Sequence, residues 1–202
     1  PFSASVCQHA AWIAQRSGVA VELMHVLGRR EAGEKIDLSG AISLGARTAL
    51  LEELSTLDEA RAKLVAHRGR AILEDAQGIL TSAGITNVTT RLRHGDIIEA
   101  MAETEDQADM VLIGKRGEAA DFAKGHLGSN LERIVRASHK PIFVASRAFA
   151  PIQKMMVAFD GGDSAKRAVE EIIRNPLYIG LSVHIVSVGR AAPEVKAAMQ
   201  HA

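Results

Sequence analysis

The stretch that most constrains the fold of this chain runs from residue 108 to residue 146. It opens with a short apolar run at residues 110–113, breaks at a glycine-containing loop, and resumes with apolar residues at helical spacing from residue 131. Lys140-Pro141 ends that helix, and a second short apolar run follows. The order strand, loop, helix, strand predicts a parallel β-α-β unit.

The first half of the loop has the residues of a ligand site. Gly114 and Gly117 have no Cβ, so a ligand can approach their backbone closely. Lys115 and Arg116 lie between them and add positive charge. An ordinary turn, in which the glycines serve geometry alone, is the alternative interpretation of this spacing.

The second half of the loop leads into the predicted helix. Gly128 and Ser129 lie where that helix begins, and the free N–H groups of a helix N-terminus favour an anion, most often phosphate. Ser129 or Asn130 can cap the helix or touch a phosphate oxygen. The pattern is neither a P-loop nor G-x-G-x-x-G.

These residues together resemble the nucleotide loop of the universal stress protein (UspA) family. The loop between Gly117 and Gly128 is one residue longer than is usual in that family. The resemblance implies an α/β fold: a doubly wound parallel sheet with strand order 3-2-1-4-5 and helices on both faces. It also implies that the chain binds ATP, with Mg²⁺ held through the phosphates and no dedicated protein ligands.

The same resemblance implies roles for individual residues. The phosphates would be held by Gly114, Gly117, Gly128, Ser129 and Asn130, with Lys115 and Arg116 nearby. Val26 and Ile113 would lie along the adenine and ribose. Asp160 is the counterpart, in a second copy of the domain, of a family aspartate that approaches the adenine or ribose. No residue is assigned a catalytic role or a direct bond to a metal.

The chain contains an internal repeat, because residues 164–189 match residues 2–28 in the order helix, break, apolar strand, glycine. We therefore expect a first UspA-like domain at residues 1–148 and the start of a second at residues 149–202. The strand at residues 155–159 has no counterpart in the first copy, so the chain is expected to be short at both ends. Either residues are missing from the chain, or this strand fills the vacant central position, a form of domain swapping.

The remaining helices and strands are predicted from the spacing of apolar residues and from the residues that end helices and strands. Helices are predicted at residues 3–17, 44–83, 97–102 and 164–174, and strands at residues 19–27, 88–92 and 181–188. Asp96 is either the N-cap of the short third helix or a ribose ligand. The long helix either covers the sheet and overhangs it, or is a coiled-coil or partner helix.

Composition excludes several classes of protein. The formal net charge is zero, which favours neither nucleic acid nor an anionic membrane as a partner. Cys7 is the single cysteine, so no intrachain disulfide forms; we expect it to be buried, with a reactive thiol as the alternative. No apolar run reaches the ~20 residues of a membrane span, and no signal peptide opens the chain, so the expected location is the cytoplasm.

Three function classes remain open. The first is an ATP-binding stress-response or regulatory module. The second is a slow ATP hydrolase, for which Asp121 and His126 are the only nearby candidates to activate water. The third is a nucleotide-free scaffold, in which the long helix and a dimer surface matter most. The resemblance also implies a homodimer through the apolar edge at residues 141–145, or an intramolecular pair of domains.

Overall fold

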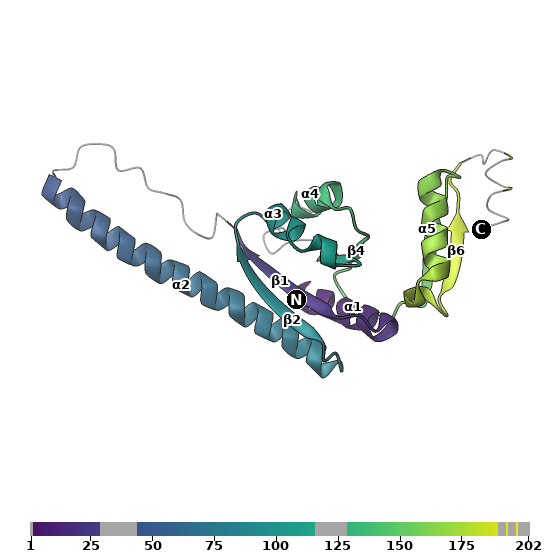
Figure 1. Cartoon of the computed structure of the whole chain (residues 1–202), viewed down its shortest axis with the longest axis horizontal. Helices are drawn as coiled ribbons and strands as arrows, with labels where there is room; N and C mark the ends of the chain where they lie inside the picture. The colour runs from purple at the N-terminus through teal and green to yellow at the C-terminus, as the bar shows by residue number, and fades with distance from the viewer. Residues whose placement is uncertain (1, 29–43, 116–128, 190–192, 194–196, 198–202) are drawn as a thin grey trace. The chain divides into compact units, whose positions relative to one another are not determined.

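Short parallel strand pairs, each joined by a helix, make up the fold (Figure 1). The computed structural model describes residues 2–28, 44–115, 129–189, 193 and 197. Contacts divide the chain into two units. Unit 1 comprises Pro1–Ala11 and Ala20–Phe149, and unit 2 comprises Trp12–Val19 and Ala150–Ala202.

The first strand pair of unit 1 joins β1 (Val21–Leu27) to β2 (Val88–His94). The strands are parallel, with Val21 opposite Val88 and Leu27 opposite His94. Both strands were predicted, and β2 continues two residues beyond its predicted end at residue 92. Residues of a strand alternate between its two faces, so Leu92 faces one side of the pair, while Arg91 and Arg93 face the other.

Helix α2 (Leu44–Ser82, 39 residues) connects these strands and packs on the Leu92 side. Its buried residues recur at intervals of four, three and four, the spacing of one helix face: Gly69, Leu73, Ala76 and Leu80. A Cβ on Gly69 would lie 2.8 Å from Leu92 Cδ1, so glycine allows the helix to approach the strands closely. The N-terminal part of α2 runs past the ends of the strands (Figure 1).

The predicted β-α-β unit is present in the second strand pair of unit 1. β3 (Val111–Gly114) and β4 (Ile142–Ala145) are parallel, with Val111 opposite Ile142 and Gly114 opposite Ala145. Helix α4 (Ser129–Ala137) lies between them in the chain. Leu131 and Ile134 point into the core, whereas Val135 is half-exposed. The predicted helix α3 (Ile97–Ala102) and a 3₁₀ helix, η1 (Glu105–Gln107), precede β3.

Helix α1 (Phe2–Ser17) contributes to both units. In unit 1, Nδ1 of the buried His9 donates a hydrogen bond to the Ser5 carbonyl oxygen at 2.7 Å, and the His9 ring lies edge-on to Phe149. In unit 2, Arg16 Nε donates to the Leu177 carbonyl oxygen at 2.8 Å. Cys7 is buried, as predicted, and burial raises the pKa of its thiol.

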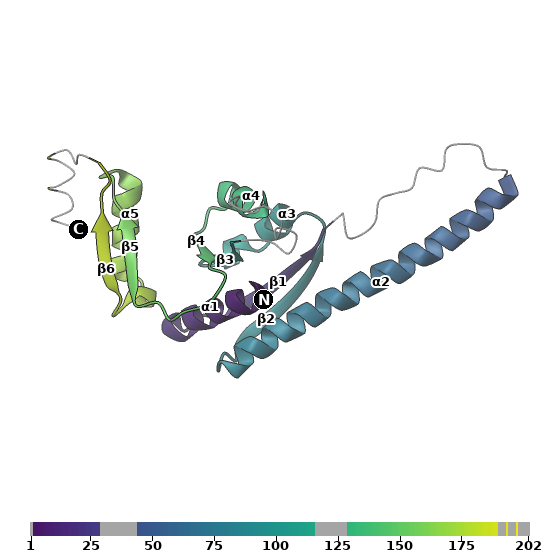
Figure 2. The same cartoon turned by 180° about the vertical axis from the view of Figure 1, so that it is seen from behind.

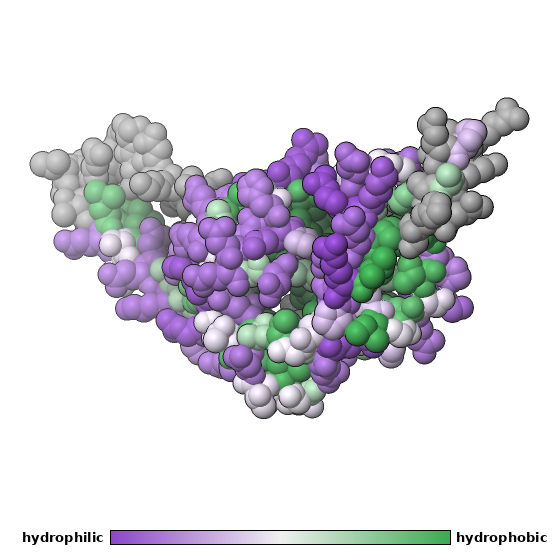
Figure 3. All heavy atoms as spheres, turned by 45° about the vertical axis from the view of Figure 1, so that its right-hand side comes forward, coloured by the Kyte–Doolittle hydropathy of each residue, from purple (hydrophilic) through white to green (hydrophobic). Residues whose placement is uncertain are grey.

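Unit 2 repeats the strand-helix-strand order of unit 1. β5 (Lys154–Ala158) and β6 (Ser182–Val186) are parallel, and α5 (Asp163–Arg174) and a 3₁₀ helix, η2 (Pro176–Tyr178), connect them (Figure 2). Its small core is formed by Val157, Phe159, Ala165 and Val169. Several large apolar side chains of unit 2 remain exposed: Met156, Ile173, Ile179, Val183 and Val188. Figure 3 shows hydrophobic atoms, coloured green, in the right-hand part of that view.

The α/β class with parallel strands is confirmed. Because the first strand of the order 3-2-1-4-5 is expected to be missing, β1, β2, β3 and β4 correspond to its strands 2, 3, 4 and 5. The order then requires β1 beside β2 and β3 beside β4, and both pairs are observed. The complete order remains a prediction, because within the described residues each strand pair forms a sheet of its own. The domain boundary at residue 148 and the identity of unit 2 as a second family domain also remain predictions.

Candidate functional site

The carboxyl ends of the strands in unit 1 are fastened to one another by backbone hydrogen bonds. The Gly95 N–H donates to the Leu27 carbonyl oxygen at 3.0 Å, which joins the turn after β2 to the end of β1. Gly95 has φ +116°, a conformation that disfavours any residue with a Cβ. The Lys115 N–H donates to the Ala145 carbonyl oxygen at 3.1 Å, which joins the ends of β3 and β4. Each pair therefore presents its carboxyl ends together.

Asp96 links the turn after β2 to the helix that follows the glycine loop. Its Oδ1 accepts from the Ile98 N–H at 2.8 Å, so Asp96 is the N-cap of α3, one of the two roles expected for it. Its Oδ2 lies 2.7 Å from Arg133 Nη2 on α4. The Arg133 hydrogen bond, followed by the Ile98 N–H, holds the pKa of Asp96 below its ordinary value. The ion pair fixes α4 beside α3.

Glu105 fixes the C-terminal end of α4. Its side chain is buried, and Oε1 accepts hydrogen bonds from the Ser138 hydroxyl, the His139 N–H at 2.8 Å and the Lys140 N–H at 3.2 Å. These three donors, led by Ser138, lower the pKa of Glu105. The carboxylate thus satisfies the backbone of the turn between α4 and β4.

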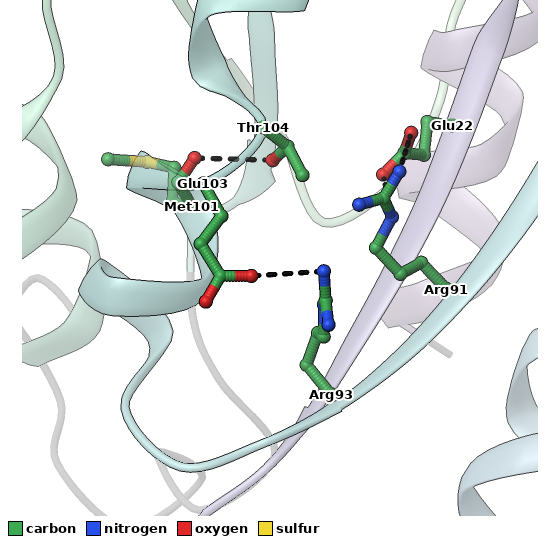
Figure 4. Close-up of polar contacts among 6 residues, drawn as sticks. All are labelled: Glu22, Arg91, Arg93, Met101, Glu103 and Thr104. Atoms are coloured by element: carbon green, nitrogen blue, oxygen red, sulfur yellow. Dashed lines mark hydrogen bonds and ion pairs between the residues drawn. The ribbon is translucent and has the colours of Figure 1, made fainter.

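Two ion pairs hold the Arg91 side of the first strand pair (Figure 4). Arg91 Nε lies 2.8 Å from Glu22 Oε1, and Arg93 Nη2 lies 3.0 Å from Glu103 Oε2, just after α3. Helix α2 packs on the Leu92 face of this pair, and on the other face Arg93 reaches Glu103, the residue that follows α3. Arg93 Nε is buried and has no hydrogen-bond partner among the described residues.

A shallow pocket of about 320 Å³ lies between β2 and α3. Three of its lining residues are acidic, against one arginine, so it is poorly suited to a phosphate. None of the predicted nucleotide ligands lines it; the lining residues are Leu92, Arg93, His94, Asp96, Glu99, Ala100 and Glu103.

The structure describes six of the predicted site residues of unit 1. Ile113 and Gly114 end β3, and the exposed Lys115 follows directly. Ser129 and Asn130 begin α4, and the Asn130 side chain is exposed. Val26 lies on β1, opposite Arg93 of β2, and within the described residues β1 and β3 belong to separate sheets. Three predicted phosphate ligands, and both candidates for water activation, lie outside the described residues: Arg116, Gly117, Gly128, Asp121 and His126.

Asp160 follows β5 in unit 2, at the position that its counterpart role requires. Its Oδ1 accepts from the Gly162 N–H at 2.8 Å, which shapes the turn before α5. Gly161 has φ +83°, again a conformation that favours glycine. The structure therefore shows Asp160 in a turn, and its role as a ligand remains a prediction.

The described residues contain no cluster of histidine, cysteine or acidic side chains arranged to hold a metal ion. Among the same residues, no helix is both long enough and apolar enough to cross a bilayer.

The sequence did not mark Arg133, Glu105 or His9 as functional residues. Arg133 is 37 residues from Asp96, and Ser138 is 33 residues from Glu105, so no local spacing marks either pair. Glu105 lies in a run of acidic residues that is typical of a solvated surface. The capping pattern at Asp96 was the one available signal in this part of the site.

Comparison with known proteins places these features in a family. Residues 1–146 match the family model described as the universal stress protein family. A universal stress protein of Synechocystis sp. is 34% identical over 198 residues, which cover 97% of this chain and 69% of that protein. A universal stress protein of Mycobacterium tuberculosis is 31% identical over 94 residues, which cover 45% of this chain and 29% of that protein.

A solved structure shares the fold. The structure of the hypothetical protein MJ0577 matches with a TM-score of 0.51 and 19% sequence identity, covering 72% of this chain and 88% of that one. At this level of identity the likeness supports the α/β fold alone.

Proposed function

This chain belongs to the universal stress protein family, and on that premise we propose that it binds ATP as a nucleotide-binding stress-response or regulatory module. One observation carries the proposal: β3 ends at Gly114 and α4 begins at Ser129, the strand-loop-helix arrangement that the glycine pattern predicts. A loop that joins the carboxyl end of a parallel strand to a helix N-terminus is where α/β proteins commonly bind phosphate groups.

The described ends of the loop fit a polyphosphate. Lys115 presents an exposed cation at the carboxyl end of β3, and Asn130 presents an exposed amide in the first turn of α4. The first N–H groups of α4 have no partner within the helix and favour an anion. Asp96 holds the middle of α4 through Arg133, and Glu105 holds the turn after its C-terminal end, so the position of the helix is fixed before a ligand arrives.

In the proposed complex, the loop glycines, Ser129 and Asn130 hold the phosphates, and Lys115 and Arg116 balance their charge. Val26 and Ile113 flank the base and ribose. Mg²⁺ binds through the phosphate oxygens, where it neutralises charge between them. We also propose that Asp160 serves a site of unit 2, that the protein is cytoplasmic, and that β4 contributes an edge to a homodimer or an intramolecular domain pair.

The test is to denature the purified chain and identify any released nucleotide by anion-exchange chromatography beside ATP, ADP and AMP standards. We expect ATP near one equivalent per chain, either retained during purification or taken up when ATP and Mg²⁺ are added. ADP in place of added ATP, with release of phosphate, would show hydrolysis. Absence of nucleotide, with no uptake, would refute the proposal.

Substitutions in the glycine loop test whether the nucleotide binds there. Gly117→Val and Gly128→Val place side chains where the phosphates are proposed to approach the backbone, so both should lose nucleotide. Gly78→Ala is the matched control, because a Cβ at that position of α2 would meet nothing within 4 Å. Equal retention of ATP by all three variants would show that the nucleotide binds elsewhere.

A further inference from the structure

The N-terminal half of α2 carries an apolar stripe that the described residues leave largely uncovered. Leu57 is 60% exposed and Leu64 is 70% exposed, while Leu50 and Leu54 are only half-buried. The buried residues of α2 begin at Gly69, so the sheet of unit 1 accounts for the C-terminal part of the helix alone. Leucines at these positions are costly to leave in water and mark an interaction surface.

The stripe is separate from the face that packs on the sheet. Leu50, Leu57 and Leu64 recur every seven residues, and Ala71 continues the repeat. A seven-residue repeat keeps side chains on one side of a helix, with a drift of ~20° per repeat. Leu64 precedes Gly69 by five residues, which places it roughly 140° around the helix from the buried face.

The charges of this part of α2 are segregated by sign. Residues 52–59 contain four acidic residues and no basic one: Glu52, Glu53, Asp58 and Glu59. Residues 61–70 contain four basic residues and no acidic one: Arg61, Lys63, Arg68 and Arg70. A single helix uses this pattern poorly, since its i,i+4 pair Lys63–Glu59 is highly exposed, with 3.7 Å between its charged atoms.

We propose that α2 is an interface for a second copy of this chain, with the two helices packed antiparallel about a two-fold axis between Ala60 and Arg61. This register brings the acidic half of each helix beside the basic half of the other, with Asp58 level with Lys63 of the second copy. It also sets Leu57 level with Leu64, and Leu50 level with Ala71. A parallel pair would place like charges at the same level, which is unfavourable.

The leucine repeat and the charge pattern are both symmetric about the same point, between Ala60 and Arg61. Neither pattern is needed for α2 to pack on the sheet of unit 1. The interface is isologous, because each copy offers the same surface to the other. The sequence allowed two interpretations of α2. The C-terminal third of the helix covers the sheet, and under this proposal the N-terminal half pairs with a partner.

The first test uses charge reversal near the axis, measured by sedimentation equilibrium on the whole chain. One variant carries Asp58→Lys and Glu59→Lys, and the other carries Arg61→Glu and Lys63→Glu. Each variant alone should sediment near the monomer mass of 21.6 kDa. The dissociation constant of its dimer should be at least tenfold higher than that of the wild type. An equimolar mixture of the two variants should return to twice that mass, because charged residues at the same level on the two helices then have opposite signs. Far-UV circular dichroism confirms that each variant keeps its helix.

The second test fixes direction and register in a Cys7→Ala background, where an introduced cysteine is the only thiol. Ala60→Cys lies beside the axis and should form an intermolecular disulfide, which requires Cα atoms within ~7 Å. Glu53→Cys is the control, since antiparallel packing separates the two thiols by about 22 Å along the helix axis. Cross-linking at both positions would indicate a parallel pair and overturn the proposal.

Three further outcomes would also overturn it: a wild-type chain that stays monomeric at all concentrations tested, a dimer that survives both charge reversals, or charge-reversed variants that stay monomeric when mixed. A dimer through the β4 edge would survive the reversals without cross-linking at Ala60→Cys. Nucleotide content, measured in the same samples, is expected to be unchanged, because none of these substitutions lies in the proposed site.

Discussion

At the scale of single residues, a buried carboxylate holds the C-terminal end of the helix that the proposed site depends on. Burying a carboxylate is costly unless donors satisfy it, and Glu105 has three donors from one turn. Because the charged form accepts these bonds, its pKa is lowered from the ordinary value of 4.5. The stability of the α4–β4 turn is therefore linked to pH.

The sign of that link is predictable. A group with a lowered folded-state pKa contributes stability that is complete above its unfolded-state pKa and is lost as the pH falls through the folded-state value. Glu105→Gln should lower the midpoint of thermal unfolding at neutral pH, and the difference from wild type should shrink as the pH falls below 4.5. Thermal melts at a series of pH values measure this, with Asp106→Asn, an exposed neighbour, as the control. A difference that is constant with pH would contradict the assigned role.

Residues with local partners were predictable, and residues with distant partners were not. Asp96 was identified as a possible N-cap because its acceptor, the Ile98 N–H, is two residues away. Its second partner, Arg133, comes from another helix, and only the folded chain brings the two together. The same holds for His9, because the ring that it contacts, Phe149, lies far away along the chain.

At the scale of elements, two of the glycines of α2, Gly69 and Gly78, differ in their surroundings. A Cβ on Gly78 would meet nothing within 4 Å, whereas a Cβ on Gly69 would lie 2.8 Å from Leu92 Cδ1 and 3.2 Å from Leu27 Cδ2. Gly78→Ala should stabilise the chain by about 0.5–1 kcal/mol, because alanine favours the helix. Gly69→Ala should gain less or lose stability, since the two leucines must move.

Gly69→Val makes the comparison sharper, because overpacking of this kind costs about 1–3 kcal/mol. Urea unfolding followed by far-UV circular dichroism gives the free energies of unfolding of all three variants. Equal effects of alanine at the two positions would show that α2 does not approach β1 and β2 as closely as described.

Most elements were predicted to within two residues, and the end of β2 shows why small differences remain. β2 was expected to end at residue 92, just before the turn His94-Gly95-Asp96. It continues because β1 offers partners as far as Leu27 and because Arg93 pairs with Glu103 outside the sheet. The end of a strand depends on its neighbour, which a pattern within the strand does not contain.

At the scale of the whole molecule, the β-α-β unit and its family could be predicted because the motif is contiguous in the chain. The strand pairs follow from that family resemblance, whereas the division into units does not. Contacts assign residues 12–19 to unit 2, although the sequence places them in the helix that opens the first predicted domain. Apolar residues of α1 recur at one helical spacing along its whole length. The sequence pattern therefore does not show where the helix passes from unit 1 to unit 2.

The proposed site residues of β1, β3 and α4 all belong to unit 1, which makes the effect of ATP on stability specific to that unit. Leu80 of unit 1 is 0% exposed and Leu177 of unit 2 is 1% exposed, so Leu80→Ala and Leu177→Ala should each cost about 2–5 kcal/mol. ATP with Mg²⁺ at a hundred times its Kd stabilises the binding unit by about 2.7 kcal/mol. It should offset much of the first loss and none of the second.

Amide hydrogen exchange resolves the two units in one experiment, because protection reports local opening. With ATP added, protection should increase in β3 and α4 of the wild type and recover there in Leu80→Ala, while β5 and β6 of Leu177→Ala stay unprotected. Equal gains in both units would place nucleotide in unit 2 as well and would support a ligand role for Asp160. Gains confined to unit 2 would contradict a site at the Gly114–Asn130 loop, since ligand stabilises only the unit that it binds.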